Sequence, residues 1–212
     1  MYRLYWAAGT GAIAPEGMLE EAGAPFERVV IDLAAGEHRQ PDYLAINPVG
    51  EVPALVLPDG TVVTESAAMV LLLGERHPEP GFVPSPEDPE RPRFLRWLLY
   101  MATTIYPTLA RMNHPERFAA PPCETEPDRS AVIQRLDAEF GVVDEAIAGD
   151  PWFLARGYGA LDLYLTMLAD WHPEKDRLLK RKPGLAALVH GVEANPVFAR
   201  VMGRHRQPDQ QR

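Results

Sequence analysis

The chain has 212 residues, of which 46% are apolar and 24% are charged, and its formal net charge is −9. This length and composition predict a globular protein with one large domain or two small ones. The acidic balance argues against phosphate-driven binding of nucleic acid, and no apolar run approaches the roughly 18 residues that a membrane span requires. No basic-then-apolar leader pattern opens the sequence, so we expect a cytoplasmic protein.

Strand and helix signals alternate over the first 77 residues. The first helical pattern has Pro15 in its first turn and ends at Gly23. Two short apolar runs flank Pro58-Asp59-Gly60, which is typical of a hairpin, and the last helical pattern ends before Pro78. We expect strands at residues 2–6, 26–33, 54–57 and 61–64 and helices at 13–22, 42–46 and 65–77, in the order β-α-β-α-β-β-α.

Residues 78–90 contain five prolines in thirteen positions, which predicts a stiff, extended linker. It divides an α/β domain at 1–77 from a domain at 91–205, where apolar residues recur at helical spacing and no strand is expected. Residues 206–212 are expected to be a flexible tail. The expected helices of the second domain cover 91–112, kinked at Pro107, then 128–149, the buried 158–171, and two shorter ones broken at Asn195-Pro196.

The loop Ala7–Ile13, with the sequence AAGTGAI, separates the first strand from the first helix. Free backbone N–H groups and the positive helix end gather at such a turn, which makes it a common place for chemistry. The only reactive side chain in this loop is the hydroxyl of Thr10.

Other residues that often carry chemistry have unfavourable settings here. The single cysteine, Cys123, lies in a segment rich in proline and acidic residues, where negative neighbours disfavour a thiolate. His172, His190 and His205 do not have the spacing of metal ligands, so we predict no metal site.

Three segments in this order resemble the cytosolic glutathione transferase family. NPVGEVPAL (Asn47–Leu55) is similar to the family's N-P-x-G-x-V-P-x-L run, and TESAAM (Thr64–Met69) is similar to its segment of an acidic residue or Gln followed by Ser-x-Ala. The opening MYRLYWAAGTGAIAPEGMLEEAG resembles bacterial members of the beta-like branch. The resemblance implies a thioredoxin-like N-terminal domain, an all-α helical-bundle C-terminal domain and a homodimer, with glutathione as co-substrate and no metal.

The resemblance also assigns residues to glutathione. The hydroxyl of Ser66 and the first N–H groups of its helix can receive the γ-glutamyl carboxylate, while Glu65 pairs with the ammonium group. Spacing alone favours an ordinary helix cap for these residues, and the surrounding motifs favour the glutathione assignment. In the family, the peptide corresponding to Val52-Pro53 is cis and turns the Val52 backbone toward the cysteinyl backbone of glutathione.

The glycyl carboxylate of glutathione is expected near GEHRQ (Gly36–Gln40). His38 and Gln40 are our assignments, with Arg39 as a further suitable donor and a solvated loop as the alternative. Asn47-Pro48 and Gly50 are interpreted as turn chemistry.

The family places a Tyr, Ser or Cys near the end of the first strand to hold the sulfur as a thiolate. In this chain the Cys and Ser positions fall on Gly11 and Ala12, which carry no such side chain. The remaining candidates are the Thr10 hydroxyl, the N–H groups of Gly11 and Ala12, Tyr5 on the strand, and Tyr106, where beta-like members often carry a His. We assign catalytic roles to Thr10 and Tyr106, with a turn-stabilising role and core packing as the respective alternatives.

A pocket for the electrophile is expected between the two domains, and Asp162 is interpreted as a structural helix cap. The function predicted from the resemblance is glutathione transfer to a small hydrophobic electrophile, in detoxification. The alternatives are a non-catalytic member that binds glutathione, hydrophobic ligands or a protein, and a glutathione-dependent isomerase or dehalogenase. The expected pocket residues are Trp6, Arg96, Tyr100, Thr103, Arg111 and Met112.

Overall fold

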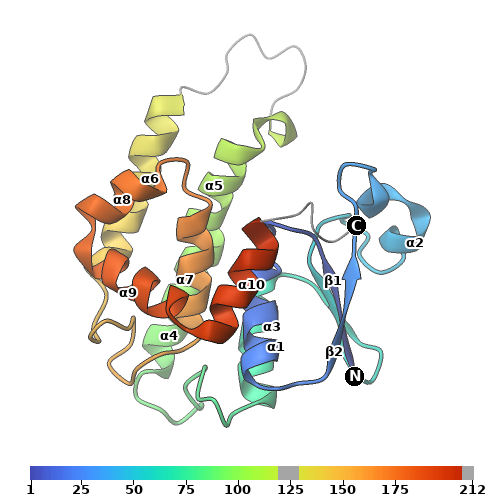
Figure 1. The fold of residues 1–212 in the computed structure, drawn as a ribbon, viewed down its shortest axis with the longest axis horizontal. Coiled ribbons are helices and arrows are strands. Elements are labelled where there is room, and N and C mark those ends of the chain that lie inside the picture. The colour runs from blue at the N-terminus through green and yellow to red at the C-terminus, as the bar shows by residue number, and fades with distance from the viewer. Residues whose placement is uncertain (119–128, 207–212) are drawn as a thin grey trace. The chain divides into compact units, whose positions relative to one another are not determined.

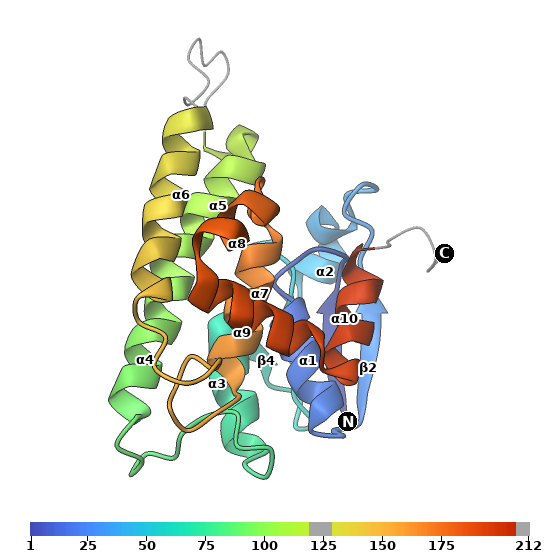
Figure 2. The same ribbon diagram turned by 60° about the vertical axis from the view of Figure 1, so that its left-hand side comes forward.

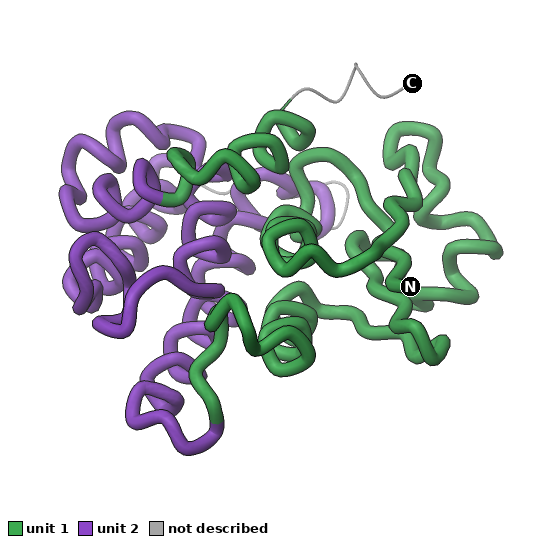
Figure 3. The backbone as a smooth tube through the Cα atoms, turned by 60° about the horizontal axis from the view of Figure 1, so that its bottom comes forward, with its two compact units in different colours: residues 1–85, 192–212 green, residues 86–191 purple. Residues whose placement is uncertain are grey.

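The computed structural model describes residues 1–118 and 129–206 (Figure 1). Cys123 and residues 207–212 of the predicted tail lie outside the described residues. The chain divides into two compact units, residues 1–85 together with 192–212, and residues 86–191 (Figure 3). The first unit therefore includes the last helix, α10 (Pro196–Arg206), in addition to the N-terminal α/β region.

The first unit is built on a four-stranded mixed sheet with the strand order β2-β1-β3-β4. Strand β1 is parallel to β2 and antiparallel to β3, and β4 is antiparallel to β3. The predicted order β-α-β-α-β-β-α of a thioredoxin-like domain is confirmed. The elements are β1 (Tyr2–Trp6), α1 (Ile13–Glu21), β2 (Phe26–Val30), the 3₁₀ turn η1 (Glu37–Arg39), α2 (Pro41–Leu44), β3 (Ala54–Val56), β4 (Val62–Val63) and α3 (Ser66–Arg76).

Alternation along β1 assigns its side chains to the two faces of the sheet. Tyr2, Leu4 and Trp6 are buried on one face. On the other face, Tyr5 packs edge-on against Tyr43 of α2, with 5.7 Å between the ring centres. Helix α1 packs against both α3 and α10, and α2 lies on the opposite side of the sheet (Figures 1 and 2). The sheet thus has a layer of three helices on one face, while the short α2 covers one edge of the opposite face.

The second unit is helical, and no strand occurs among its described residues, as predicted. Helix α7, which is buried at every residue except Asp170, is the central helix expected at 158–171. None of the helices in the described ranges has the length and apolarity needed to cross a membrane. The elements are α4 (Arg91–Tyr100), the π-helical turn η2 (Met101–Ile105), α5 (Tyr106–Asn113), the 3₁₀ turn η3 (Pro115–Arg117), α6 (Arg129–Asp144), α7 (Ala160–Asp170), α8 (Lys175–Arg181) and α9 (Pro183–Glu193), of which the last extends into the first unit.

The second unit differs from the sequence prediction at three places. The long helix expected at 91–112 contains a π-helical turn before Pro107, in which the Tyr106 N–H donates to the Met101 carbonyl. Proline has no amide hydrogen, so this region cannot keep an uninterrupted α-helical ladder. Helix α6 ends at Asp144 rather than at Gly149, and the short, strongly charged α8 was not predicted.

Candidate functional site

Strand register brings four separate segments of the first unit to one edge of the sheet. Trp6 of β1 lies opposite Val30 of the parallel β2, and Tyr5 lies opposite Ala54 of the antiparallel β3. Strand β4 runs antiparallel to β3. The ends of β1, β2 and β4 and the start of β3 therefore lie at the same edge. The segments at this edge are the loops at 7–12 and 31–40, the turn at 47–53 and the junction at 64–66.

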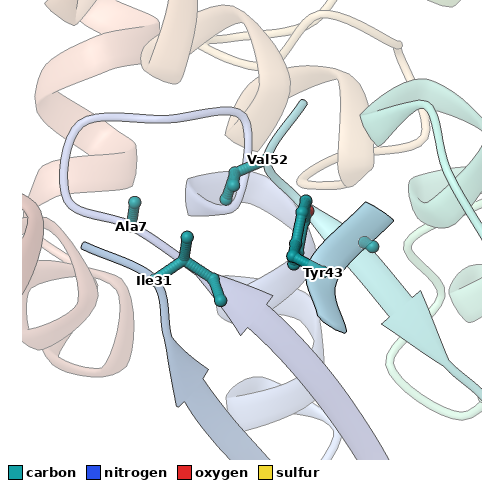
Figure 4. Close-up of a cluster of buried hydrophobic side chains, with 5 residues drawn as sticks. Ala7, Ile31, Tyr43 and Val52 are labelled. Atoms are coloured by element: carbon teal, nitrogen blue, oxygen red, sulfur yellow. The ribbon is translucent and has the colours of Figure 1, made fainter. Parts of the chain in front are cut away.

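A cluster of buried apolar side chains holds three of these segments together (Figure 4). It consists of Ala7, Ile31, Tyr43, Val52 and Ala54, which come from the ends of β1 and β2, from α2 and from the start of β3. The loop after β1 and the turn before β3 are thus neighbours in space. The sequence predicted this arrangement through the resemblance alone.

The loop after β1 uses the Thr10 hydroxyl internally. Thr10 Oγ1 donates to the Ala7 carbonyl at 2.7 Å, and the Ala12 N–H donates to the same oxygen at 3.4 Å. These contacts give Thr10 the turn-stabilising role that was the alternative to catalysis. The amide N–H groups of Thr10 and Gly11 make no hydrogen bond to any residue that the structure describes. They lie just before α1, whose positive end favours an anion.

The turn before β3 is built around a carbonyl that accepts two hydrogen bonds. The Val52-Pro53 peptide is cis, as the resemblance implies. The Tyr43 hydroxyl and Asn47 Nδ2 donate to the Glu51 carbonyl at 2.6 and 2.7 Å. Burial raises the pKa of Tyr43 to about 12, so its hydroxyl keeps the proton that it donates. These contacts fix the backbone on which Val52 presents its N–H and C=O.

Gly50 lies where the turn approaches the loop after β2. Its φ is +68°, and a Cβ there would lie 2.8 Å from Arg39 Nη1 and 3.0 Å from the His38 carbonyl oxygen. Arg39 Nη1 also donates to the Val49 carbonyl at 3.1 Å, so Arg39 supports this turn. His38 is half-buried and Gln40 is exposed, and these two remain the predicted donors to a carboxylate.

The junction between β4 and α3 has an unusual backbone. Glu65 has φ +62° and ψ 107°, and it is the single non-glycine residue with positive φ in the described ranges. Such a conformation costs about 1–3 kcal/mol and occurs preferentially at ligand-binding positions. It precedes Ser66, whose side chain is buried at the first turn of α3. The Glu65 side chain is exposed next to the N-terminal N–H groups of this helix.

A buried polar network lies beneath the loop after β1. Glu16 Oε2 accepts hydrogen bonds from Trp6 Nε1 at 2.6 Å and His205 Nε2 at 2.8 Å, while Arg204 donates to Oε1 at 2.9 and 3.1 Å. The Gly9 N–H donates to His205 Nδ1 at 3.1 Å. Burial tends to raise the pKa of Glu16, but the His205 hydrogen bond and the nearby charges outweigh it, so the pKa lies below its usual range.

The sequence did not predict this network, which includes Trp6, a residue that the sequence assigned to the electrophile pocket. The Trp6 side chain is only 2% exposed and packs against the His205 ring, with 4.7 Å between the ring centres. The one available signal was Glu16 among the apolar residues of the first two turns of α1. Its partner His205 is 189 positions away, so no local pattern indicates the contact.

The remaining catalytic candidate, Tyr106, lies in the second unit at the start of α5. Its ring is half-buried and packs edge-on against Trp171, with 5.1 Å between the ring centres. This is the packing role weighed against catalysis, and a catalytic role for Tyr106 stays a prediction.

The other predicted pocket residues lie on α4, η2 and α5 of the second unit. The Arg96 guanidinium lies 4.7 Å from the centre of the Trp97 ring, and that of Arg111 lies 5.5 Å from the Phe118 ring. Met112 is only 6% exposed and belongs to the core. The exposed members are Arg96, Thr103 and Arg111, and Tyr100 is half-buried.

Asp162 has the structural role predicted for it. Its carboxylate accepts hydrogen bonds from the Gly159 and Phe153 N–H groups at 2.7 and 2.8 Å, which caps α7. Burial raises the pKa of Asp162 to about 7, although both backbone hydrogen bonds act in the other direction. Elsewhere in the described ranges, no group of three or more His, Cys, Asp or Glu side chains is arranged to hold a metal ion.

The chain is similar to known proteins in sequence and in structure. The family model described as "Glutathione S-transferase, N-terminal domain" matches residues 15–76. Over 195 residues, the chain is 29% identical to glutathione S-transferase GstA of Escherichia coli O157:H7, covering 92% of this chain and 94% of that protein. Over 173 residues, it is 30% identical to the disulfide-bond oxidoreductase YfcG of Escherichia coli K12, covering 77% of this chain and 76% of that protein.

A solved structure is similar over almost the whole chain. It is a glutathione transferase homologue from Sulfitobacter with bound glutathione, and it matches with a TM-score of 0.87 and 29% identity. The match covers 96% of this chain and 98% of the other.

Proposed function

Because the chain belongs to the glutathione S-transferase family, we propose that it binds glutathione at the sheet edge of the first unit and activates its thiol through backbone N–H groups. The observation that carries this proposal is the strand register, which places four segments with suitable groups at one edge. The Sulfitobacter homologue with bound glutathione supports the same ligand.

The functional groups at this edge match the chemistry of glutathione. The N–H groups at the start of α3 and the Ser66 hydroxyl receive the γ-glutamyl carboxylate, and Glu65 pairs with the ammonium group. The N–H and C=O of Val52 pair with the cysteinyl backbone, for which the cis peptide supports the orientation. His38 and Gln40 donate to the glycyl carboxylate.

The thiolate is held by backbone donors in the loop after β1. A free thiol has a pKa of about 8.5, and lowering it by one or two units corresponds to about 1.4–2.7 kcal/mol. The Thr10 hydroxyl already donates to the Ala7 carbonyl, whereas the N–H groups of Thr10 and Gly11 have no partner within the described chain. Two hydrogen bonds to the sulfur and the positive end of α1 can supply this stabilisation.

The reaction that follows is attack of the thiolate on a small hydrophobic electrophile. The sulfur forms a new bond to carbon while the leaving group departs with the electron pair of the broken bond. With an activated double bond, the π pair of that bond instead moves onto the electron-withdrawing group, which takes a proton from water. Of the predicted pocket residues, we retain Arg96, Tyr100, Thr103 and Arg111 as candidates for contacts with the electrophile. Tyr106 is retained as a candidate catalytic residue. The homodimer and the cytoplasmic location remain predictions.

A second candidate function is thiol–disulfide exchange with glutathione. The relative YfcG is described as a disulfide-bond oxidoreductase. In the present chain, the four segments at the sheet edge, including the loop after β1, contain no cysteine. The glutathione thiolate would then attack a substrate disulfide and release one thiolate, and a second glutathione would resolve the mixed disulfide. The same backbone donors would serve both reactions.

The test is a titration of glutathione into the protein, with thiolate absorbance followed against pH and S-methylglutathione as the thiol-free control. We expect binding of both ligands and a thiol pKa at least one unit below that of free glutathione. Turnover with an activated aryl halide would support transfer to carbon, and reduction of a small disulfide would support exchange. Absence of glutathione binding would refute the proposal, and binding with an unshifted thiol pKa would favour a non-catalytic carrier.

A further inference from the structure

The carboxylate of Glu16 organises the polar network beneath the loop after β1. It is fully buried on α1, and both of its oxygens are occupied. Oε2 accepts from Trp6 and His205, and Oε1 accepts from Arg204, with Arg28 Nε 3.4 Å away. An ionised carboxylate accepts hydrogen bonds and donates none, so every group that faces it must be a donor.

This arrangement determines which nitrogen of His205 carries the proton. Nε2 faces the Glu16 carboxylate at 2.8 Å and must therefore be protonated. Nδ1 faces the Gly9 N–H at 3.1 Å and must therefore carry a lone pair. Trp6 Nε1 lies 2.9 Å from Nε2, but its proton is directed to Glu16 at the shorter distance of 2.6 Å. His205 is thus neutral, with its proton on Nε2.

The only loop group that His205 contacts through a hydrogen bond, among the described residues, is the Gly9 amide. Gly9 has φ +68°, a left-handed conformation that glycine adopts without strain. The turn at Gly9 sets the direction of the next two amides. Those amides belong to Thr10 and Gly11. The His205 side chain is only 1% exposed, so solvent cannot easily replace its lone pair as the acceptor.

We propose that His205 is a positioning residue for the thiolate site: its Nδ1 lone pair anchors the Gly9 amide and thereby orients the N–H groups of Thr10 and Gly11 toward the glutathione sulfur. This inference rests on the proposed function, because it assigns those amides to the sulfur. Helix α10, at the far end of the sequence, thus supports the site at the end of the first strand. The groups that set the charge around His205 are Glu16 and Glu20 on α1, Arg28 on β2 and Arg204 on α10.

Substitution of His205 by Gln or by Asn tests the roles of its two ring nitrogens separately. In His205→Gln, the terminal amide can still donate to Glu16, but no acceptor remains opposite the Gly9 N–H. In His205→Asn, the side-chain oxygen takes the place of Nδ1, while the donor to Glu16 is lost. Arg206→Gln is the matched control, because Arg206 is exposed on the same helix and pairs with Glu193.

The first measurement uses the protein without glutathione. The imidazole ¹⁵N spectrum at neutral pH, assigned by the resonances that His205→Gln removes, should show a protonated Nε2 and a bare Nδ1 for His205. The Gly9 amide should exchange with solvent faster in His205→Gln than in wild type and His205→Asn. A protonated Nδ1 in wild type, or equal Gly9 exchange in all variants, would overturn the proposal whatever the ligand is.

The second measurement uses bound glutathione. We expect the thiol pKa to rise by about one unit and kcat with an activated aryl halide to fall about tenfold in His205→Gln, while KM for glutathione changes less than about twofold. His205→Asn and Arg206→Gln should keep a thiol pKa close to that of wild type. A wild-type thiol pKa in His205→Gln, or equal changes in both His205 variants, would overturn the positioning role alone. Failure of wild type to bind glutathione would instead overturn the proposed function.

Discussion

The residue that best defines the chemistry of this site is Thr10, because its hydroxyl proton already has an acceptor. Donation to the Ala7 carbonyl at 2.7 Å closes the loop on itself. The hydroxyl can donate to only one acceptor at a time, so a bond to sulfur would cost the loop this contact. The N–H groups of Thr10 and Gly11 are therefore the better donors for a thiolate.

Removal of this hydroxyl should affect stability more than thiol activation. In Thr10→Val, we expect loss of about 1 kcal/mol in the free energy of unfolding. Valine has nearly the same shape as threonine, so the substitution mainly removes one hydrogen bond. The thiol pKa of bound glutathione should change by less than about half a unit. Thr10→Ser keeps the hydroxyl and is the control. A rise of one unit or more in Thr10→Val alone would show that the hydroxyl acts on the sulfur.

Asp162 should make stability depend on pH near neutrality. The pKa of about 7 in the folded protein lies above the ordinary value of 3.8, so the folded state holds a proton that the unfolded state has lost. Stability is then greatest below the unfolded pKa and falls as the pH rises to about 7. Between pH 5 and pH 8, the free energy of unfolding from urea titrations should fall by about 2 kcal/mol relative to Asp162→Asn, whose side chain does not titrate. Equal pH profiles for the two proteins would refute the raised pKa.

At the scale of elements, the candidate site depends on how strands and helices begin and end. Helix α3 begins at Ser66 directly after the strained Glu65, and β3 begins directly after the cis Val52-Pro53 peptide. The loop after β1 ends where α1 begins. Backbone groups at such junctions lie outside the regular hydrogen-bond pattern of strands and helices, so a peptide ligand can use them.

The charge of Glu65 should be needed for the ammonium group of glutathione and not for folding. In Glu65→Gln, we expect the Kd for glutathione to rise about tenfold, because a charged hydrogen bond contributes about 1.5–3 kcal/mol and the amide retains part of it. The free energy of unfolding should be unchanged within about 0.5 kcal/mol, since the side chain is exposed.

N-acetylglutathione, which has no ammonium group, provides the control for Glu65. Wild type and Glu65→Gln should bind it with equal affinity. If the substitution weakens both ligands equally, Glu65 acts by its backbone conformation and not by its charge.

The turn before β3 should tolerate no side chain at Gly50. Gly50→Ala adds strain at φ +68° and places a Cβ 2.8 Å from Arg39 Nη1, so we expect a loss of about 2–3 kcal/mol in the free energy of unfolding. Gly60→Ala is the matched control, because Gly60 has φ +90° with no atom within 4 Å of the added Cβ. It should cost about 1 kcal/mol from backbone strain alone. Equal losses for the two variants would exclude a steric contribution at Gly50.

At the scale of the whole molecule, the two ends of the chain belong to one unit. Helix α10 packs against α1 (Figure 1), where Arg204 pairs with the charge of the buried Glu16 and His205 donates a hydrogen bond to it. The N-terminal α/β fold is therefore completed by a helix that the chain supplies last. We expect a chain that ends before α10 to leave Glu16 buried with far fewer partners.

Substitution of Glu16 should destabilise the protein strongly at neutral pH. In Glu16→Gln, we expect a loss of about 3 kcal/mol in the free energy of unfolding, because the donors that surround the carboxylate lose their acceptor charge. The lowered pKa of Glu16 stabilises the folded state above the unfolded pKa of about 4.5, and this contribution disappears as the pH falls through the folded pKa. The acid destabilisation of wild type should thus be weaker in Glu16→Gln.

Glu20 is the control for the Glu16 substitution, because it lies one turn further along α1 and also pairs with Arg204. Its side chain is partly solvated, so Glu20→Gln should cost about 1 kcal/mol or less. A loss of the same size in both variants would contradict the special role of the buried carboxylate.

The sequence alone predicted the order of the elements and indicated the segments that we propose as the site. Period-2 and period-3.6 patterns, Pro15, Gly23 and the Pro58-Asp59-Gly60 turn are local signals, because each acts on the conformation of its own few residues. The resemblance of Asn47–Leu55 and Thr64–Met69 to a known family added the cis peptide and the ligand. The absence of a cysteine or serine at Gly11 and Ala12 was equally evident from the sequence.

Only the tertiary structure decided how the polar groups around this loop are used. It directed the Thr10 hydroxyl to Ala7, packed the Trp6 ring against His205, and placed His205 against Gly9. The last two depend on contacts between segments far apart in the chain, since His205 is 196 positions from Gly9. Local sequence patterns determine which groups need partners, but the choice of partner is made by packing, and that choice defines the chemistry of the loop.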